Sequence, residues 1–292
     1  MSQPQYIGRF APSPTGLLHM GSLMTAIASY CDAMSKNGQW LVRIEDLDPP
    51  REVAGASHEI LNSLNAFGFE FDQNVVFQSH NQRQSAYNEI LKKLIDLDTV
   101  YYCCCSRAEL KSTSIANHQC RNNSKIPNKP YSIKIKVPDL VISFDDEIQG
   151  IQSTNLLQDC GDFVIQRKDQ LFAYQIAVVV DDAYQGITNT VRGIDLIDST
   201  PWQIYLNSLL GFNQMSYAHL PILVNSKGQK LSKQTFAKEI DQSNTVNTLM
   251  QAYSFLNQTP FLSKPKSISD FWKHAINNWN INNVSKIDSI TV

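Results

Sequence analysis

The stretch RFAPSPTGLLHMGS, residues 9–22, constrains the fold of this chain more than any other feature. A short apolar run at residues 6–10 predicts a strand, and the prolines and glycine that follow predict a tight loop. From Ser22 the apolar residues recur at helical spacing as far as Met34. A helix N-terminus presents free N–H groups that suit phosphate, and Gly21 lets a ligand approach the backbone. His19 can donate a hydrogen bond to a phosphate oxygen.

A second motif, KLSKQ at residues 230–234, follows a predicted strand at residues 220–224 and a polar turn at residues 225–229. Its lysines, Lys230 and Lys233, are mobile point charges that suit the negative charge growing on a departing pyrophosphate. Lysines in a loop are usually only solvated, so this motif alone is a weak signal. It indicates a phosphate site only in combination with the first motif. Together the two motifs predict a site that binds ATP and promotes attack on its α-phosphate.

These two segments resemble the HIGH and KMSKS signatures of class I aminoacyl-tRNA synthetases. Four longer segments are similar to the glutamate branch of that family: RFAPSPTG (9–16), VRIEDLD (42–48), VVDDAYQGIT (179–188) and VRG (191–193). The resemblance runs from residue 6 to about residue 238. It implies an α/β fold with a Rossmann-like, doubly wound parallel sheet and ATP at the carboxyl ends of its strands.

A glutamate substrate carries two carboxylates and one ammonium group, and the candidate partners follow from charge. Arg9 and Arg192 offer bidentate forks to carboxylates, and Glu45 offers a partner to the ammonium group. Tyr174 offers a hydroxyl group and a ring wall. An alternative is that Arg9 and Glu45 form a purely structural ion pair. The resemblance adds the backbone and side chains of residues 9–13 to the glutamate site, namely Arg9, Phe10, Ala11, Pro12 and Ser13.

The chemistry that the resemblance implies needs no covalent enzyme intermediate. The α-carboxylate of glutamate attacks the α-phosphorus of ATP, and positioning and electrostatics supply the catalysis. His19 and Lys233 are the predicted catalytic residues, Gly21 and Lys230 complete the predicted ATP site, and Mg²⁺ accompanies the ATP.

Four of the six cysteines are grouped at Cys103, Cys104, Cys105 and Cys120. Cys103, Cys105 and Cys120 resemble the zinc knuckle of this family, whose pattern adds a tyrosine four residues before the last cysteine. Ala116 stands at that position here, and His118 could replace the tyrosine to give three sulfurs and one nitrogen. A zinc site with these ligands and a set of ordinary reduced thiols therefore remain alternatives.

About 54 residues follow residue 238, which is too few for the anticodon-binding region of ordinary glutamyl-tRNA synthetases. The chain therefore resembles the truncated family of glutamyl-queuosine tRNA(Asp) synthetases. That family activates L-glutamate without tRNA and attaches it to queuosine in the anticodon of tRNA(Asp). The alternatives are a short glutamyl-tRNA synthetase that charges tRNA(Glu), a nucleotidyltransferase outside tRNA biology, and a non-catalytic relative.

Four segments are predicted: residues 1–100 and 171–240 as the two halves of the catalytic domain, 101–170 as an insert with the cysteines, and 241–292 as a small helical region. We expect the chain to re-enter the parallel sheet through residues 163–165 and 176–180. Neither a signal peptide nor a run of about 20 apolar residues is visible, which predicts a cytoplasmic protein. The net charge of −2 excludes only a uniformly basic RNA-binding surface.

Overall fold

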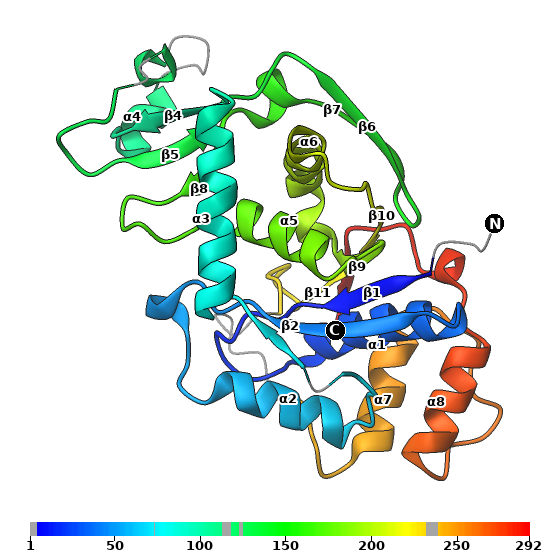
Figure 1. Cartoon of the computed structure of the whole chain (residues 1–292). Helices are drawn as coiled ribbons and strands as arrows, with labels where there is room; N and C mark the ends of the chain where they lie inside the picture. The colour runs from blue at the N-terminus through cyan, green and yellow to red at the C-terminus, as the bar shows by residue number, and fades with distance from the viewer. Residues whose placement is uncertain (1–4, 73, 113–117, 123–124, 232–238) are drawn as a thin grey trace.

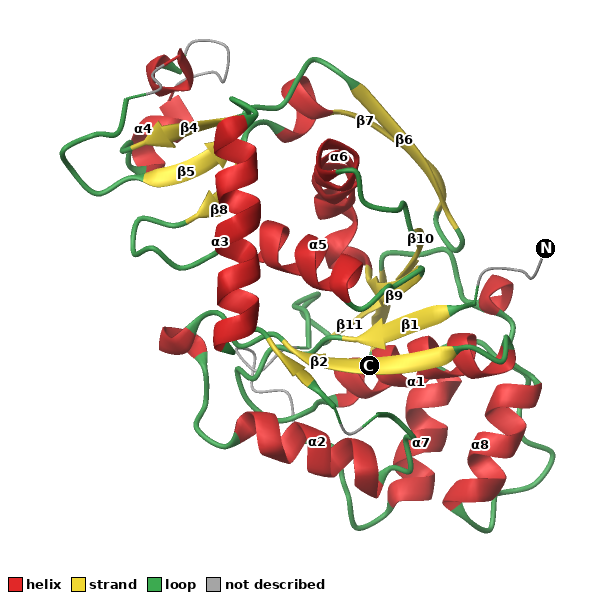
Figure 2. Cartoon of the chain, viewed as in Figure 1, coloured by secondary structure: helices red, strands yellow, loops and turns green. Residues whose placement is uncertain are grey.

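The computed structural model describes the chain except residues 1–4, 73, 113–117, 123–124 and 232–238. Its centre is a seven-stranded sheet, shown in Figures 1 and 2. The strand order across the sheet is β3 (Val76–Phe77), β2 (Gln39–Ile44), β1 (Ile7–Phe10), β9 (Asn189–Gly193), β10 (Ser216–Leu220), β6 (Val141–Asp146) and β7 (Gly150–Asn155). All neighbouring pairs are parallel except the β6–β7 hairpin at one edge. The prediction of an α/β fold with a doubly wound parallel sheet is confirmed.

Helices cover both faces of this sheet (Figure 1). One face carries α1 (Met20–Ser35), with α7 (Thr245–Ser254) and α8 (Ile268–Asn277) packed against it and α2 (Ala56–Ala66) beside them. The other face carries α3 (Asn81–Asp96), α5 (Tyr174–Tyr184) and α6 (Thr200–Leu210). Each layer buries its own apolar cluster, so the sheet lies between two hydrophobic cores.

The predicted strand and helix of the first motif are confirmed as β1 and α1. The middle of α1, from Leu23 to Ala33, is buried almost completely because the helix lies between the sheet and the C-terminal helices. The small helical region expected at residues 241–292 contains two short helices, α7 and α8. Their aromatic residues join the core beneath α1, where Trp272 packs edge-on against Tyr30.

The expected return to the parallel sheet through residues 163–165 and 176–180 is wrong. Residues 163–165 do form a strand, β8 (Phe163–Gln166), but it pairs with β5 (Ser132–Ile135), which in turn pairs with β4 (Val100–Cys103), in a separate antiparallel sheet. Residues 176–180 lie in helix α5 rather than in a strand. This run of buried apolar residues carries no periodicity, and such runs suit a fully buried helix as well as a buried strand.

The single strand expected at residues 220–224 is also wrong, because it is broken at Pro221. β10 ends at Leu220, and β11 (Ile222–Val224) pairs with β12 (Ser289–Thr291) in a sheet of its own. Proline has no N–H to donate, so it separates the two ladders.

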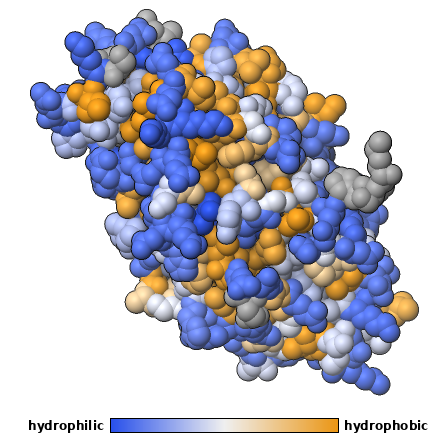
Figure 3. Space-filling view, viewed as in Figure 1, coloured by the Kyte–Doolittle hydropathy of each residue, from blue (hydrophilic) through white to orange (hydrophobic). Residues whose placement is uncertain are grey.

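The segment 101–170 contributes to two sheets. Its β5 and β8 form the small sheet with β4, beside which lies α4 (Arg107–Ser112), whereas its β6–β7 hairpin extends the central sheet. Hydrophilic residues cover most of the face drawn in Figure 3, and apolar residues gather along its middle. Among the described residues, no helix is long and apolar enough to cross a membrane.

Candidate active site

A cavity of about 570 Å³ opens where β1 and β9 end and α1 begins. These carboxyl ends of parallel strands are the usual ligand-binding edge of a doubly wound sheet. The cavity wall contains every residue predicted from the sequence for glutamate or ATP that the structure describes: Arg9, Phe10, Ala11, Pro12, Ser13, His19, Gly21, Glu45, Tyr174, Arg192 and Lys230. Lys233 lies outside the described residues.

His19 caps helix α1 at the cavity. Its ring accepts a hydrogen bond from the Ser22 backbone N–H, and the Ser22 hydroxyl lies 3.0 Å from Nε2. A Cβ on Gly21 would come within 3.2 Å of the His19 ring, so glycine lets the ring fold over the start of the helix. The imidazole and the helix N-terminus therefore face the same space, which suits a phosphate group.

Arg9, in the cavity wall, is the first of a series of positive and negative side chains that pair with one another. Its Nε donates to Asp182 Oδ1 at 3.4 Å, and Asp182 Oδ1 also accepts from Arg43 Nη1 at 2.7 Å. Arg43 Nη2 lies 3.3 Å from Glu45 Oε1. Arg9 is therefore paired with Asp182, and Glu45 is paired with Arg43. These pairs replace the direct structural pair of Arg9 with Glu45 that was the alternative.

The same series sets the ionisation of its two carboxyl groups. Burial alone would raise the pKa of Asp182, but the Arg43 and Arg9 guanidinium groups outweigh it and hold the pKa below its usual range. Burial raises the pKa of Glu45, and Arg43 and Arg9 reverse only part of that rise. Glu45 is therefore a carboxylate with an incomplete set of cationic partners, as the partner of a substrate ammonium group should be.

Arg192 is fixed from another direction, at the far wall of the cavity. Its Nη1 donates to Gln203 Oε1 at 2.8 Å and to the Tyr174 hydroxyl at 3.3 Å. Nη2 donates to Thr200 Oγ1 at 2.8 Å, and Nε donates to Nε2 of the buried His219 at 3.0 Å. A cation, a carboxylate and a second cation consequently surround one cavity, in the form of Arg9, Glu45 and Arg192.

Lys230 lies at the cavity mouth, where its Nζ is 2.5 Å from Asp195 Oδ2. Asp195 follows β9 in a short 3-10 helix, so this ion pair joins Lys230, the first residue of the second motif, to the segment that leaves the central sheet. The first two residues of the second motif, Lys230 and Leu231, therefore line the same cavity as the first motif.

The catalytic domain of class I tRNA synthetases for glutamate and glutamine (E and Q) matches residues 7–254. The chain belongs to this family. The synthetase is 47% identical, over 96% of its own length and 98% of the relative's, to the Glutamyl-Q tRNA(Asp) synthetase of Neisseria meningitidis serogroup A. It is 46% identical to the protein of that name from Acinetobacter baylyi, over 96% and 94% of the two chains. For the one from Chromobacterium violaceum the identity is 44%, over 97% of each chain.

Solved structures agree on the fold of the synthetase. The glutamate-tRNA synthetase of Elizabethkingia anophelis superposes with a TM-score of 0.80 over 99% of this chain and 68% of its own, at 24% identity. A glutamate tRNA ligase from Elizabethkingia meningosepticum, crystallised with its amino acid, gives a TM-score of 0.79 over 98% and 67%, also at 24% identity.

Sequence reasoning missed the buried groups that hold the synthetase's arginines. Arg43 and Asp182 lie inside the blocks VRIEDLD and VVDDAYQG, yet no role was predicted for them. Charged residues next to apolar runs were an available signal, because a charge inside a buried segment needs a partner. No such signal marks His219 and Asp146, since their contact joins β10 to the end of β6.

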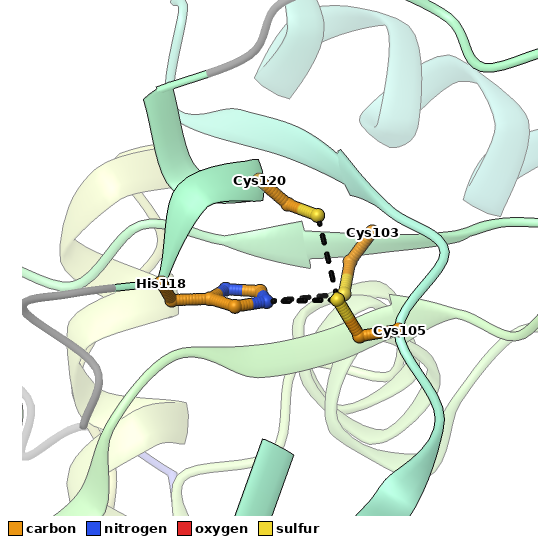
Figure 4. Close-up of side chains that lie close together, drawn as sticks. All are labelled: Cys103, Cys105, His118 and Cys120. Carbon is orange, nitrogen blue, oxygen red and sulfur yellow. Dashed lines mark hydrogen bonds between the residues drawn. The ribbon is translucent and has the colours of Figure 1, made fainter. Parts of the chain in front are cut away.

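The four predicted metal ligands of the synthetase also converge (Figure 4). The ligand atoms of Cys103, Cys105, His118 and Cys120 all lie within 4.8 Å of one another. Cys105 Sγ is 3.6 Å from Cys120 Sγ and 3.4 Å from His118 Nε2. Tetrahedral zinc, with Zn–S bonds of about 2.3 Å, would separate two sulfurs by about 3.8 Å. The donor set and its spacing fit zinc.

Further features of the cluster favour a metal. Burial and the positive charge of Lys134 lower the pKa of His118, which keeps the ring neutral as a ligand must be. His118 turns Nδ1 toward the Tyr101 hydroxyl at 3.4 Å and leaves Nε2 for the sulfurs. Burial and the neighbouring thiols raise the pKa of Cys105 to about 12, so the metal-free thiol is protonated and binding of a cation would have to release its proton.

Proposed function

We propose that this synthetase activates L-glutamate with ATP and transfers the glutamate to queuosine in the anticodon of tRNA(Asp). The observation that carries the activation step is the meeting of Arg9, Glu45 and Arg192 with the N-terminus of α1 in one cavity. The acceptor is inferred from the relatives named Glutamyl-Q tRNA(Asp) synthetase, which align over almost the whole chain.

In the proposed activation step, the guanidinium groups of Arg9 and Arg192 hold the carboxylates of glutamate, and Glu45 pairs with its ammonium group. Tyr174 and the backbone of residues 10–13 line the same binding site. An α-carboxylate oxygen attacks the α-phosphorus of ATP, the bond to the bridging oxygen breaks, and pyrophosphate leaves with glutamyl-adenylate remaining. No side chain forms a bond to either substrate, because positioning supplies the rate enhancement.

His19, Gly21 and the N-terminus of α1 would receive the phosphates of ATP, with Lys230 and Lys233 offsetting the charge that develops on pyrophosphate. Mg²⁺ would accompany the ATP phosphates. In the second step, a hydroxyl group of the queuosine base attacks the carbonyl carbon of the adenylate and AMP departs.

We also propose a structural zinc site formed by Cys103, Cys105, His118 and Cys120. The site would join the end of β4 to the short helix at Gln119–Asn122, away from the cavity, so it would stabilise the small sheet and take no part in adenylate formation.

Pyrophosphate exchange tests the activation step. The purified protein should incorporate labelled pyrophosphate into ATP when L-glutamate is supplied and tRNA is omitted, and it should exchange much less with L-aspartate or L-glutamine. Exchange that depends on another amino acid, or that requires tRNA(Glu), would contradict the proposal.

A further inference from the structure

Behind Arg192 lies a chain of buried groups that the proposed reaction does not itself use. His219, on β10, is paired in register with Arg192 on the neighbouring strand β9. The side chain of His219 has no exposed surface. His219 Nε2 faces Arg192 Nε at 3.0 Å, while Nδ1 faces Asp146 Oδ2 at 2.5 Å. Asp146 is buried as well, at the end of β6.

The Asp146 carboxylate has its two oxygens in different surroundings. Oδ1 lies within hydrogen-bond distance of three backbone N–H donors, those of His219 (3.1 Å), Ile148 (3.1 Å) and Gln149 (2.8 Å). Oδ2 is left to face the imidazole. Three N–H donors require an acceptor at the Oδ1 position, so an amide in place of this carboxylate would keep its oxygen there and turn its nitrogen toward the imidazole.

This arrangement decides where the imidazole carries its proton. Nδ1 must carry it, because Nδ1 faces a carboxylate oxygen. Nε2 then has a free lone pair, which is the acceptor that the Arg192 Nε–H requires. The opposite tautomer would place two N–H donors against each other. Burial and the charge of Arg192 also lower the pKa of His219 against the opposing effect of Asp146, which keeps the ring neutral.

The result is an arginine that is oriented but not neutralised. Among the described residues, the side chains that accept from Arg192 are His219, Thr200, Gln203 and Tyr174, and none of them is a carboxylate. Arg9 differs, because Asp182 pairs with it directly. A carboxylate behind Arg192 would fix it equally well but would offset the charge that a substrate carboxylate needs.

We propose that His219, held in its Nδ1–H form by Asp146, is a positioning residue that orients the Arg192 guanidinium toward a glutamate carboxylate while leaving its charge available. The inference rests on the proposed glutamate-binding function of the cavity. It gives Asp146, at the end of β6, a part in substrate binding, although this residue is far in sequence from the two motifs at the cavity.

The isosteric variant Asp146→Asn tests the tautomer. Because three N–H groups hold the Oδ1 position, the amide nitrogen of the substituted side chain must take the Oδ2 position and donate to His219 Nδ1, which forces the Nε2–H tautomer against Arg192. In pyrophosphate exchange with the full chain, we expect the KM for glutamate to rise about tenfold and the KM for ATP to stay within about twofold. Asp96→Asn, on the exposed end of α3, is the matched control.

A pair of variants at His219 tests the contact itself. Glutamine places an acceptor near the position of Nε2 and should keep the KM for glutamate within about threefold. Asparagine reaches only toward Asp146 and should raise it about tenfold. Equal effects of the two variants on the KM for glutamate, or an increase confined to the KM for ATP, would overturn the inference.

Nitrogen NMR of ¹⁵N-histidine-labelled protein separates this inference from the proposed function, because it needs no activity. The His219 signal, assigned by its loss in His219→Gln, should report the Nδ1–H tautomer in the wild type and the Nε2–H tautomer in Asp146→Asn. A wild-type Nε2–H tautomer would overturn the inference even if exchange is normal. A wild type without glutamate-dependent exchange would instead contradict the proposed function.

Discussion

The glutamate cavity and the cysteine–histidine cluster are both polar sites, but they are constructed in opposite ways. The cavity draws Arg9, Glu45, Tyr174, Arg192 and Lys230 from segments far apart in the chain, and buried partners hold its arginines. The cluster takes all four ligands from residues 103–120, two at and just after the end of β4 and two at the start of the short helix Gln119–Asn122. The cavity therefore depends on the whole fold, whereas the cluster depends on local structure at one end of the molecule (Figure 1).

The largest effect should come from removing a cavity cation. Arg9→Ala is expected to lower kcat/KM for glutamate in pyrophosphate exchange by about 100-fold, because a charge-assisted fork to a carboxylate is lost. Asp182 keeps its bond to Arg43 but loses a buried ion-pair partner, so the melting temperature should also fall, and exchange is compared below the melting transition. Arg51→Ala, at an exposed arginine, is the control. An Arg9→Ala enzyme with normal glutamate kinetics would remove Arg9 from the site.

The lysine loop should show the next largest effect. We expect Lys233→Ala to slow adenylate formation at least about tenfold while sparing the fold, because a charge opposite the leaving pyrophosphate is lost. Single-turnover formation of glutamyl-adenylate measures this step directly, and Lys227→Ala, in the exposed turn before the loop, is a matched control. If Lys233→Ala exchanges pyrophosphate at the wild-type rate, its assigned role is wrong.

A smaller, pH-dependent effect should come from Glu45. Its folded-state pKa is raised by burial, so the carboxylate becomes protonated at a higher pH than an ordinary glutamate, and it then no longer pairs with an ammonium group. We expect kcat/KM for glutamate to fall on the acid side with a midpoint above about 4.5, the ordinary value. The Glu45→Gln profile should lack this limb. An unchanged limb in that variant would assign the titration to another group.

The smallest effect on activity should come from the metal cluster. We expect the purified protein to contain about one equivalent of zinc, and Cys105→Ser to lose it and melt at a lower temperature. Exchange below the melting transition should stay within about twofold, because the cluster does not reach the cavity. Cys104→Ser is the matched control beside it. A metal-free wild type, or a Cys105→Ser variant that loses exchange while folded, would break the contrast between the two sites.

The same contrast explains what the sequence could predict. The phosphate-facing turn was predictable because a strand, a proline-rich loop and a helix are adjacent in the chain, as β1 and α1 confirm. The cysteine cluster was predictable for the same reason, although Ala116, the position at which the family pattern has its tyrosine, lies outside the described residues.

Features that depend on distant segments were harder to predict. The run at residues 176–180 is buried all round, so its pattern suits either a strand or a helix, and the structure contains helix α5. The contact between His219 and Asp146 depends on how the β6–β7 hairpin joins the central sheet beside β10. The sequence around each of these two residues gives no signal that their strands will pair.

The central claim concerns the acceptor of the activated glutamate. The most direct measurement is attachment of labelled glutamate to purified tRNA(Asp), with and without queuosine, beside tRNA(Glu). We predict labelling of tRNA(Asp) only when queuosine is present. Labelling of tRNA(Glu) instead would contradict this account and make the protein a short translational synthetase.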